Sequence, residues 1–137
     1  MQDFDAIWDT GASGSVITQA VVDACGLVPT GIAQVHGVHG PKQTETYLVN
    51  IALPNNVVFT GLRVTKGDIL GADILIGMDI INMGDFSVTN CDGRTKFSYR
   101  TPAIEHIDYA EQARAIQRSR EKPPSRAERR RAKKGLR

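Results

Sequence analysis

The feature that most constrains the fold is the alternation of apolar and polar residues through the first hundred positions. β-branched residues are frequent in these stretches, and Gly, Pro and Asn interrupt them at short intervals. A period of two places one face of a stretch in a core and the other in solvent, as in β-strands. We therefore predict a mostly β domain over residues 1–101, with strands at residues 4–8, 15–17, 32–38, 43–53, 57–65, 74–76, 86–90 and 95–99.

Two short helices and two tight turns interrupt these strands. Thr18 is placed to cap a helix that runs to about Cys25 and stops at Gly26, and residues 78–83 are typical of a helical turn that Gly84 ends. Residues 54–56 and 90–93 are rich in Asn, Asp and Gly, which tolerate positive φ. We expect each of these two turns to close a hairpin.

The C-terminal part differs in period and in charge. Residues 102–117 have the pattern of an amphipathic helix, which we expect to pack on the β domain. Residues 118–137 carry ten Lys or Arg against two Glu, a net charge of +8, whereas the rest of the chain carries −6. We predict that residues 118–137 form a disordered basic tail, which either contacts nucleic acid or another polyanion or is merely solvated.

Length and composition indicate a single intracellular domain. A chain of 137 residues suits one hydrophobic core, and no apolar run approaches the roughly 18 residues needed to cross a bilayer. Residues 1–8 lack the pattern of a secretory signal, and two cysteines are too few for a disulfide framework. We therefore expect a cytoplasmic protein with no membrane association.

One acidic residue stands out within the apolar stretch "AIWDTGASGSVIT". Asp9 follows Ala6, Ile7 and Trp8 and leads into a turn. A carboxylate brought into apolar surroundings costs desolvation energy unless it is hydrogen-bonded or shares a proton, so Asp9 is a candidate functional residue. A turn-capping aspartate at a strand end is the simpler alternative.

Three segments together resemble one enzyme family. Residues 9–13, Asp-Thr-Gly-Ala-Ser, are similar to the active-site signature of aspartic proteases, and the length of the chain is similar to that of the single-domain, retropepsin-like branch. Residues 74–77, followed by a short helix, resemble the apolar-apolar-Gly segment behind the active-site loop, and residues 35–41 hold a Gly-rich turn at the place of the family's flap. The resemblance covers roughly residues 4–100 and implies a closed β-barrel of the acid-protease fold.

The resemblance also implies a function. Members of this family are endopeptidases in which two facing aspartates activate a water, one ionised and one protonated, with no metal, cofactor or covalent intermediate. This chain has one Asp-Thr-Gly motif, so the resemblance implies a homodimer in which each copy supplies Asp9 as the catalytic residue. The substrate would be a polypeptide.

Further site residues are implied by the same resemblance. In the active-site loop, Thr10 would bond across the dimer, Gly11 would present its carbonyl group to the substrate, and Ala12 would line the cleft beside Ser13. The remaining implied residues are those of the flap, His36, Gly37, Val38, His39 and Gly40, and those that support the cleft, Ile74, Leu75, Ile76 and Gly77. Gly37 and Gly40 would let the flap bend over an extended peptide.

Some positions depart from the family's pattern and leave alternatives open. Viral members often pair an acidic residue after the Ala with an Arg after the apolar-apolar-Gly segment, and here those places hold Ser13 and Met78. Viral members also have a longer segment before the motif. Either the chain is a fragment of a longer precursor, or its dimer is built differently, with residues 86–99 as the candidate. A catalytically inactive peptide-binding or dimerisation module of the same fold is one alternative function, and a nucleic-acid-associated protein that acts through its basic tail is another.

Other polar residues have simpler explanations. His36 and His39 lack enough neighbouring ligands for a metal site. Ser13 and Ser15 have no partners at the spacing of a serine nucleophile's triad, and we expect Asp79 to cap or brace the helix after Gly77.

Overall fold

The chain divides into a β unit, residues 1–104, and a C-terminal unit, residues 105–137. The computed structural model describes residues 1–37 and 40–121, and the two units are treated separately. The elements of the β unit are, in chain order, β1 (Ala6–Trp8), β2 (Val16–Ile17), α1 (Gln19–Cys25), β3 (Gly31–Gly37), β4 (Gly40–Ala52), β5 (Val58–Lys66), β6 (Ile74–Ile76), α2 (Met78–Ile81), β7 (Asp85–Cys91) and β8 (Arg94–Arg100). The predicted mostly β fold is confirmed.

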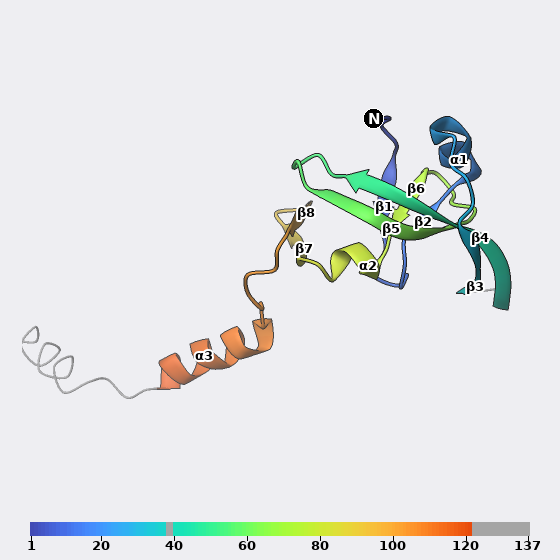
Figure 1. Cartoon of the computed structure of the whole chain (residues 1–137). Helices are drawn as coiled ribbons and strands as arrows, with labels where there is room; N and C mark the ends of the chain where they lie inside the picture. The colour runs from blue at the N-terminus through green and yellow to red at the C-terminus, as the bar shows by residue number, and fades with distance from the viewer. Residues whose placement is uncertain (38–39, 122–137) are drawn as a thin grey trace, which may run out of the picture. The chain divides into compact units, whose positions relative to one another are not determined.

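A six-stranded sheet forms the body of the β unit, with the strand order β1-β6-β2-β5-β4-β3 (Figure 1). β1 and β6 run parallel, and Trp8 pairs with Ile76 at their ends. β2 lies antiparallel to β6 and parallel to β5. Because parallel strands end at the same edge of a sheet, this order brings the residues after Trp8 beside the residues after Ile76.

Two clusters of apolar side chains make the core. The first joins β2 and α1 to the middle of the sheet, through Ile17, Val21, Val22, Tyr47 and Val64. The second lies under α2, through Ile51, Phe59, Ile76 and Ile80. Ile76 and Ile80 flank the segment that follows β6, so this segment is anchored on both sides.

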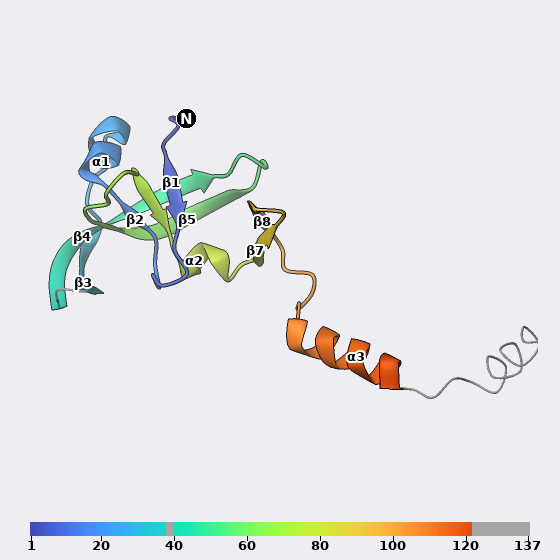
Figure 2. The same cartoon turned by 180° about the vertical axis from the view of Figure 1, so that it is seen from behind.

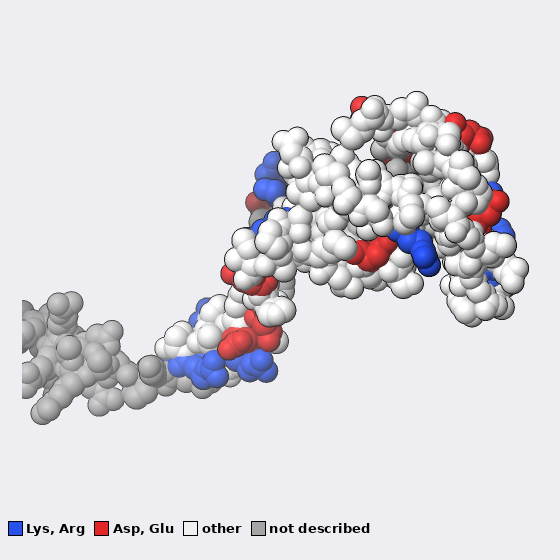
Figure 3. All heavy atoms as spheres, viewed as in Figure 1, with Lys and Arg blue, Asp and Glu red and all other residues white. Residues whose placement is uncertain are grey.

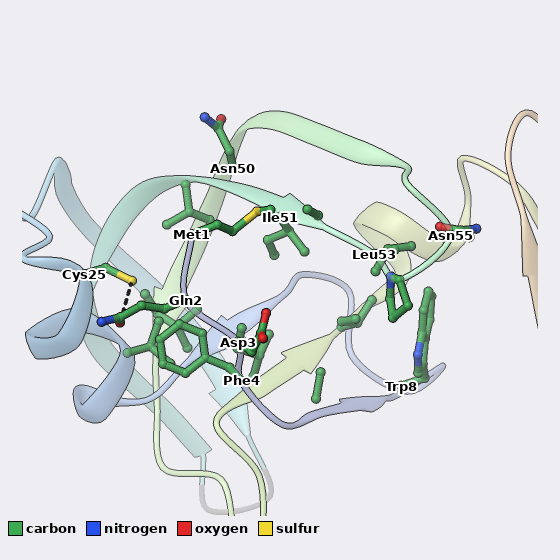
Figure 4. Close-up of a pocket in the computed structure, with 18 of the residues that line it drawn as sticks. Met1, Gln2, Asp3, Phe4, Trp8, Cys25, Asn50, Ile51, Leu53 and Asn55 are labelled. Carbon is green, nitrogen blue, oxygen red and sulfur yellow. Dashed lines mark hydrogen bonds between the residues drawn. The ribbon is translucent and has the colours of Figure 1, made fainter.

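The sheet curls, and in the described part of the chain it brings an unpaired edge of β1 and an unpaired edge of the second half of β4 to the two sides of one cavity. Among the described residues, β1 pairs only with β6, and β4 pairs with β3 over its first half and with β5 over its second half. A cavity of about 1270 Å³ lies between β1 and the second half of β4. Trp8 and Leu53 lie at one end of this cavity, and Phe4 and Cys25 lie at the other (Figure 4). No pairing between described residues closes the sheet here, so the closed barrel stays a prediction.

β7 and β8 form a separate antiparallel hairpin. Phe86, Phe97 and Tyr99 of this hairpin surround the indole ring of Trp8, with centroid distances of 5.9, 5.0 and 4.9 Å. The hydroxyl group of Tyr99 also donates a hydrogen bond of 2.8 Å to the carbonyl oxygen of Ile80. The hairpin is therefore attached both to β1 and to α2.

Most predicted boundaries are confirmed within three residues, and two details need correction. Thr18 stands at the N-cap of α1 but makes no side-chain capping bond; its carbonyl oxygen accepts the N–H of Val22, and its hydroxyl oxygen has no partner among the described residues. α2 ends at Ile81 rather than at residue 83, because the N–H groups of Met83 and Gly84 bond three residues back instead of four. The predicted turns are present, and Asn56 and Asp92 have positive φ.

In the C-terminal unit, the described residues contain helix α3 (Tyr109–Glu121). Asp108 caps it, since Oδ1 accepts the N–H of Glu111 at 2.9 Å. The helix therefore begins later than the predicted residue 102, and residues 118–121 are helical rather than disordered. The rest of the predicted tail, residues 122–137, lies outside the described residues. The packing of this helix on the β unit stays a prediction.

Candidate active site

Asp9 lies at the end of β1, where the backbone of β6 holds it. Its N–H donates a hydrogen bond of 2.9 Å to the carbonyl oxygen of Ile76. This bond continues the parallel ladder by one residue beyond Trp8. The Asp9 side chain is half-buried at this edge of the sheet.

The turn after Asp9 is folded around its carboxylate. Asp9 Oδ1 accepts the N–H of Gly11 at 2.7 Å, and the Asp9 carbonyl oxygen accepts the N–H of Ala12 at 3.3 Å. A side chain on Gly11 would bring its Cβ to 3.1 Å from Oδ1. The sequence Asp-Thr-Gly-Ala thus forms a tight turn that orients one carboxylate oxygen and leaves the other without a bond in the turn.

The segment after β6 presses on the back of this turn. Met78 donates its N–H to the carbonyl oxygen of Ala12 at 2.8 Å. A Cβ on Gly77 would stand 2.7 Å from the carbonyl carbon and oxygen of Gly14, a distance that real Cβ atoms do not show. Only glycine fits at position 77, and the predicted support segment does lie against the predicted loop.

Ser15 and Asp79 join the same two segments through side chains. Ser15 donates its hydroxyl to Asp79 Oδ1 at 2.7 Å, and Asp79 Oδ2 accepts the Ser15 N–H at 2.9 Å. The prediction that Asp79 braces the helix is confirmed by a bond of 3.0 Å from the N–H of Ile80, but its pairing with Ser15 was missed. Alternation places Ser15 on the same inward face as Ile17, which indicates that Ser15 is buried but does not name its partner.

The predicted flap corresponds to the hairpin of β3 and β4, which projects from the sheet (Figures 1 and 2). Gly37 pairs with Gly40 at its tip, and His36, one position earlier, is exposed. Val38 and His39 lie outside the described residues. Closure of this hairpin over a substrate stays a prediction.

The cavity between β1 and β4 is separate from the candidate active site. Its lining includes Trp8 and Ile76 but neither Asp9 nor any residue of the loop after it. Within residues 1–37 and 40–121, no group of three or more His, Cys, Asp or Glu side chains is arranged to hold a metal ion. In the same residues, no helix is long and apolar enough to span a membrane.

The Asp-Thr-Gly turn at the end of β1, backed by the apolar-apolar-Gly segment, is the arrangement that the resemblance to aspartic proteases implies. The family described as "gag-polyprotein putative aspartyl protease" matches residues 1–83. The match covers more than half of the chain, which therefore belongs to this family of retroviral-type aspartyl proteases. Comparison with curated proteins finds no match.

Proposed function

We propose that the chain is an aspartic endopeptidase that hydrolyses peptide bonds as a homodimer, with Asp9 of each copy forming the catalytic pair. The observation that carries this proposal is the position of the Asp9 carboxylate, fixed by Gly11 and Ile76 in a turn that Gly77 backs. The sequence supplies one such motif, so a pair of facing aspartates requires a second copy.

Two carboxylates about 3 Å apart cannot both ionise, so the pair shares one proton. The ionised Asp9 acts as the general base on a water molecule, and the protonated Asp9 donates a hydrogen bond to the carbonyl oxygen of the scissile bond. The base takes a proton from the water as the water attacks, and it gives this proton to the leaving amine as the tetrahedral intermediate breaks down. The bond between Gly11 N–H and Asp9 Oδ1 fixes the orientation of each carboxylate during these steps.

The β7–β8 hairpin supports a dimer interface near the site. Val88 and Phe97 face each other across the hairpin and remain 53% and 43% exposed. Phe97 also contacts Trp8, the residue directly before Asp9. A second copy that covers these two side chains would bury apolar surface on the element that packs against β1.

The substrate in this proposal is an extended polypeptide. The β3–β4 hairpin would close over it, with Gly37 and Gly40 as the positions that bend. Thr10 would bond to the partner copy, and Ala12 and Ser13 would line the cleft beside the scissile bond.

The test is the hydrolysis of an unfolded protein at mildly acidic pH by the purified chain. Asp9→Asn keeps the size of the side chain but cannot act as the base, so we expect a loss of at least about 10³-fold. Asp68→Asn, on an exposed carboxylate outside the site, is the matched control and should retain full activity. Equal rates for the parent and Asp9→Asn would refute the proposal, as would insensitivity to a pepstatin-like inhibitor.

One observation favours a second function, a peptide-binding module without catalysis. The open edges of β1 and β4, with an apolar cavity between them, have the form that an added β-strand can complete. A module of this kind would bind a peptide equally well after Asp9→Ala. Turnover that depends on Asp9 would exclude it as the main function.

Charge in the C-terminal unit supports an auxiliary role in binding a polyanion. On the face of the β unit seen in Figure 3, charged side chains are scattered over a mostly uncharged surface. The described part of α3 carries Arg114, Arg118 and Arg120, and the sequence after it adds further cations. Contact with a polyanion such as nucleic acid should weaken steeply with salt, and deletion of residues 118–137 should abolish it.

A further inference from the structure

The loop that carries Asp9 is attached at three places to the end of β6 and the segment that follows it. At its start, Asp9 N–H bonds to Ile76, and in its middle the Ala12 carbonyl oxygen accepts the Met78 N–H. At its end, the Ser15 hydroxyl oxygen accepts the N–H of Gly77 at 3.1 Å. The first two attachments use only backbone atoms, so any sequence with this fold can make them. The third depends on a side chain.

Ser15 makes three hydrogen bonds in this third attachment. Its hydroxyl accepts from Gly77 and donates to Asp79 Oδ1, while its N–H donates to Asp79 Oδ2. Ser15 is 1% exposed, so water cannot replace a lost partner. Removing either side chain would leave a buried donor unpaired, which is more costly than losing an exposed bond.

Asp79 connects this network to α2. Oδ1 accepts the N–H of Ile80 in addition to the Ser15 hydroxyl, and Ile80 is completely buried in the core. The end of the loop is therefore fixed to a helix that cannot shift without disturbing the core. Ser13 and Met78 stand at the places of the acid and the arginine that viral members often carry. Their side chains make no hydrogen bond among the described residues.

We propose that Ser15 and Asp79 are positioning residues that hold the Asp9 loop in its reactive geometry. The inference rests on the proposed peptidase function for its kinetic consequence, but the position of the loop can be measured without turnover. A displacement of about 1 Å in a reacting group is enough to slow catalysis by roughly 10²-fold. Neither residue touches the substrate in this proposal, since both act through the loop.

The first experiment measures the loop directly by NMR in the full chain. The amide proton of Gly11 bonds to Asp9 Oδ1, so its chemical shift reports the geometry of the turn. In Ser15→Ala we expect this signal to move and the amide of Gly77 to exchange with solvent at least roughly tenfold faster. Ser15→Thr retains a hydroxyl and should restore both values. Unchanged signals in Ser15→Ala, or equal changes in the Ala and Thr variants, would overturn the proposal.

The second experiment separates kcat from KM. Ser15→Ala should lower kcat by roughly 10- to 100-fold while KM changes by less than about threefold, because the loop and not the substrate contacts is disturbed. Asp79→Asn has nearly the same size, but its amide nitrogen cannot accept a hydrogen bond, so it should lower kcat in the same way. This variant provides the test if Ser15→Ala fails to fold. Asp68→Asn is the control for the removed charge. A moved Gly11 signal with unchanged kcat would contradict the positioning role. An inactive parent chain would refute the peptidase proposal, and the NMR experiment alone would then decide whether Ser15 and Asp79 position the loop.

Discussion

The indole ring of Trp8 lies 4.9 Å from the ring of Tyr99, and this contact joins the strand that leads to Asp9 to the β7–β8 hairpin. Tyr99 in turn donates its hydroxyl to Ile80 in α2. One aromatic residue therefore connects both segments that form the candidate site. An isolated two-stranded hairpin is at best marginally stable in water, so its order depends on these contacts.

Trp8→Ala should lower the free energy of unfolding by about 3 kcal/mol, the lower part of the range for large aromatic residues because Trp8 is only half-buried. Chemical denaturation followed by circular dichroism measures this loss. Tyr109→Ala, at an exposed position of α3, should change stability little and serves as the control. Equal stability of Trp8→Ala and the parent would mean that the hairpin is not held by the ring cluster.

Gly77→Ala should destabilise the β unit by roughly 1–3 kcal/mol or more, because its methyl group would overlap the backbone of Gly14. Gly14→Ala is a matched control, since a Cβ there meets nothing within 4 Å. Thermal unfolding of the two variants side by side measures the difference. If both variants melted at the same temperature, the backbone around Gly77 would not lie as close to Gly14 as the structure shows.

Stability should fall in acid partly through Glu45. The Lys66 ammonium, followed by the Tyr47 hydroxyl, lowers the pKa of the Glu45 carboxyl below its usual value of 4.5 by hydrogen bonding. A lowered pKa in the folded state stabilises the fold above the unfolded-state pKa, and this contribution disappears as pH falls through the folded-state pKa. Glu45→Gln should therefore lose less stability between about pH 6 and about pH 3 than the parent. An identical pH dependence in urea unfolding would contradict this assignment.

Val88→Lys should prevent dimer formation through the β7–β8 hairpin. A lysine placed on an apolar contact face leaves a charge to be desolvated, while the exposed position keeps the fold intact. Sedimentation velocity should show a monomer, and peptidase activity should fall with the dimer. Val58→Lys, at a similarly exposed position of β5, is the control. A dimer that persists in Val88→Lys would place the interface elsewhere.

The sequence by itself determined the strands, α1 and the place of Asp9 in a turn. These features are local: an apolar period of two specifies a strand, and residues such as Asn56 and Asp92 accept the positive φ that a hairpin turn needs. Residues 9–13 and 74–77 also resemble the motifs of aspartic proteases, and the family match agrees with that resemblance.

Only the tertiary structure decided which of these segments meet. Ser15 and Asp79 are 64 residues apart, and neither position carries a local signal that names the other. The parallel pairing of β1 with β6 and the open edges beside the cavity depend likewise on which distant strands satisfy one another's hydrogen bonds. A strand's period fixes which face is buried but not its neighbour, because the choice of neighbour depends on the packing of the whole sheet.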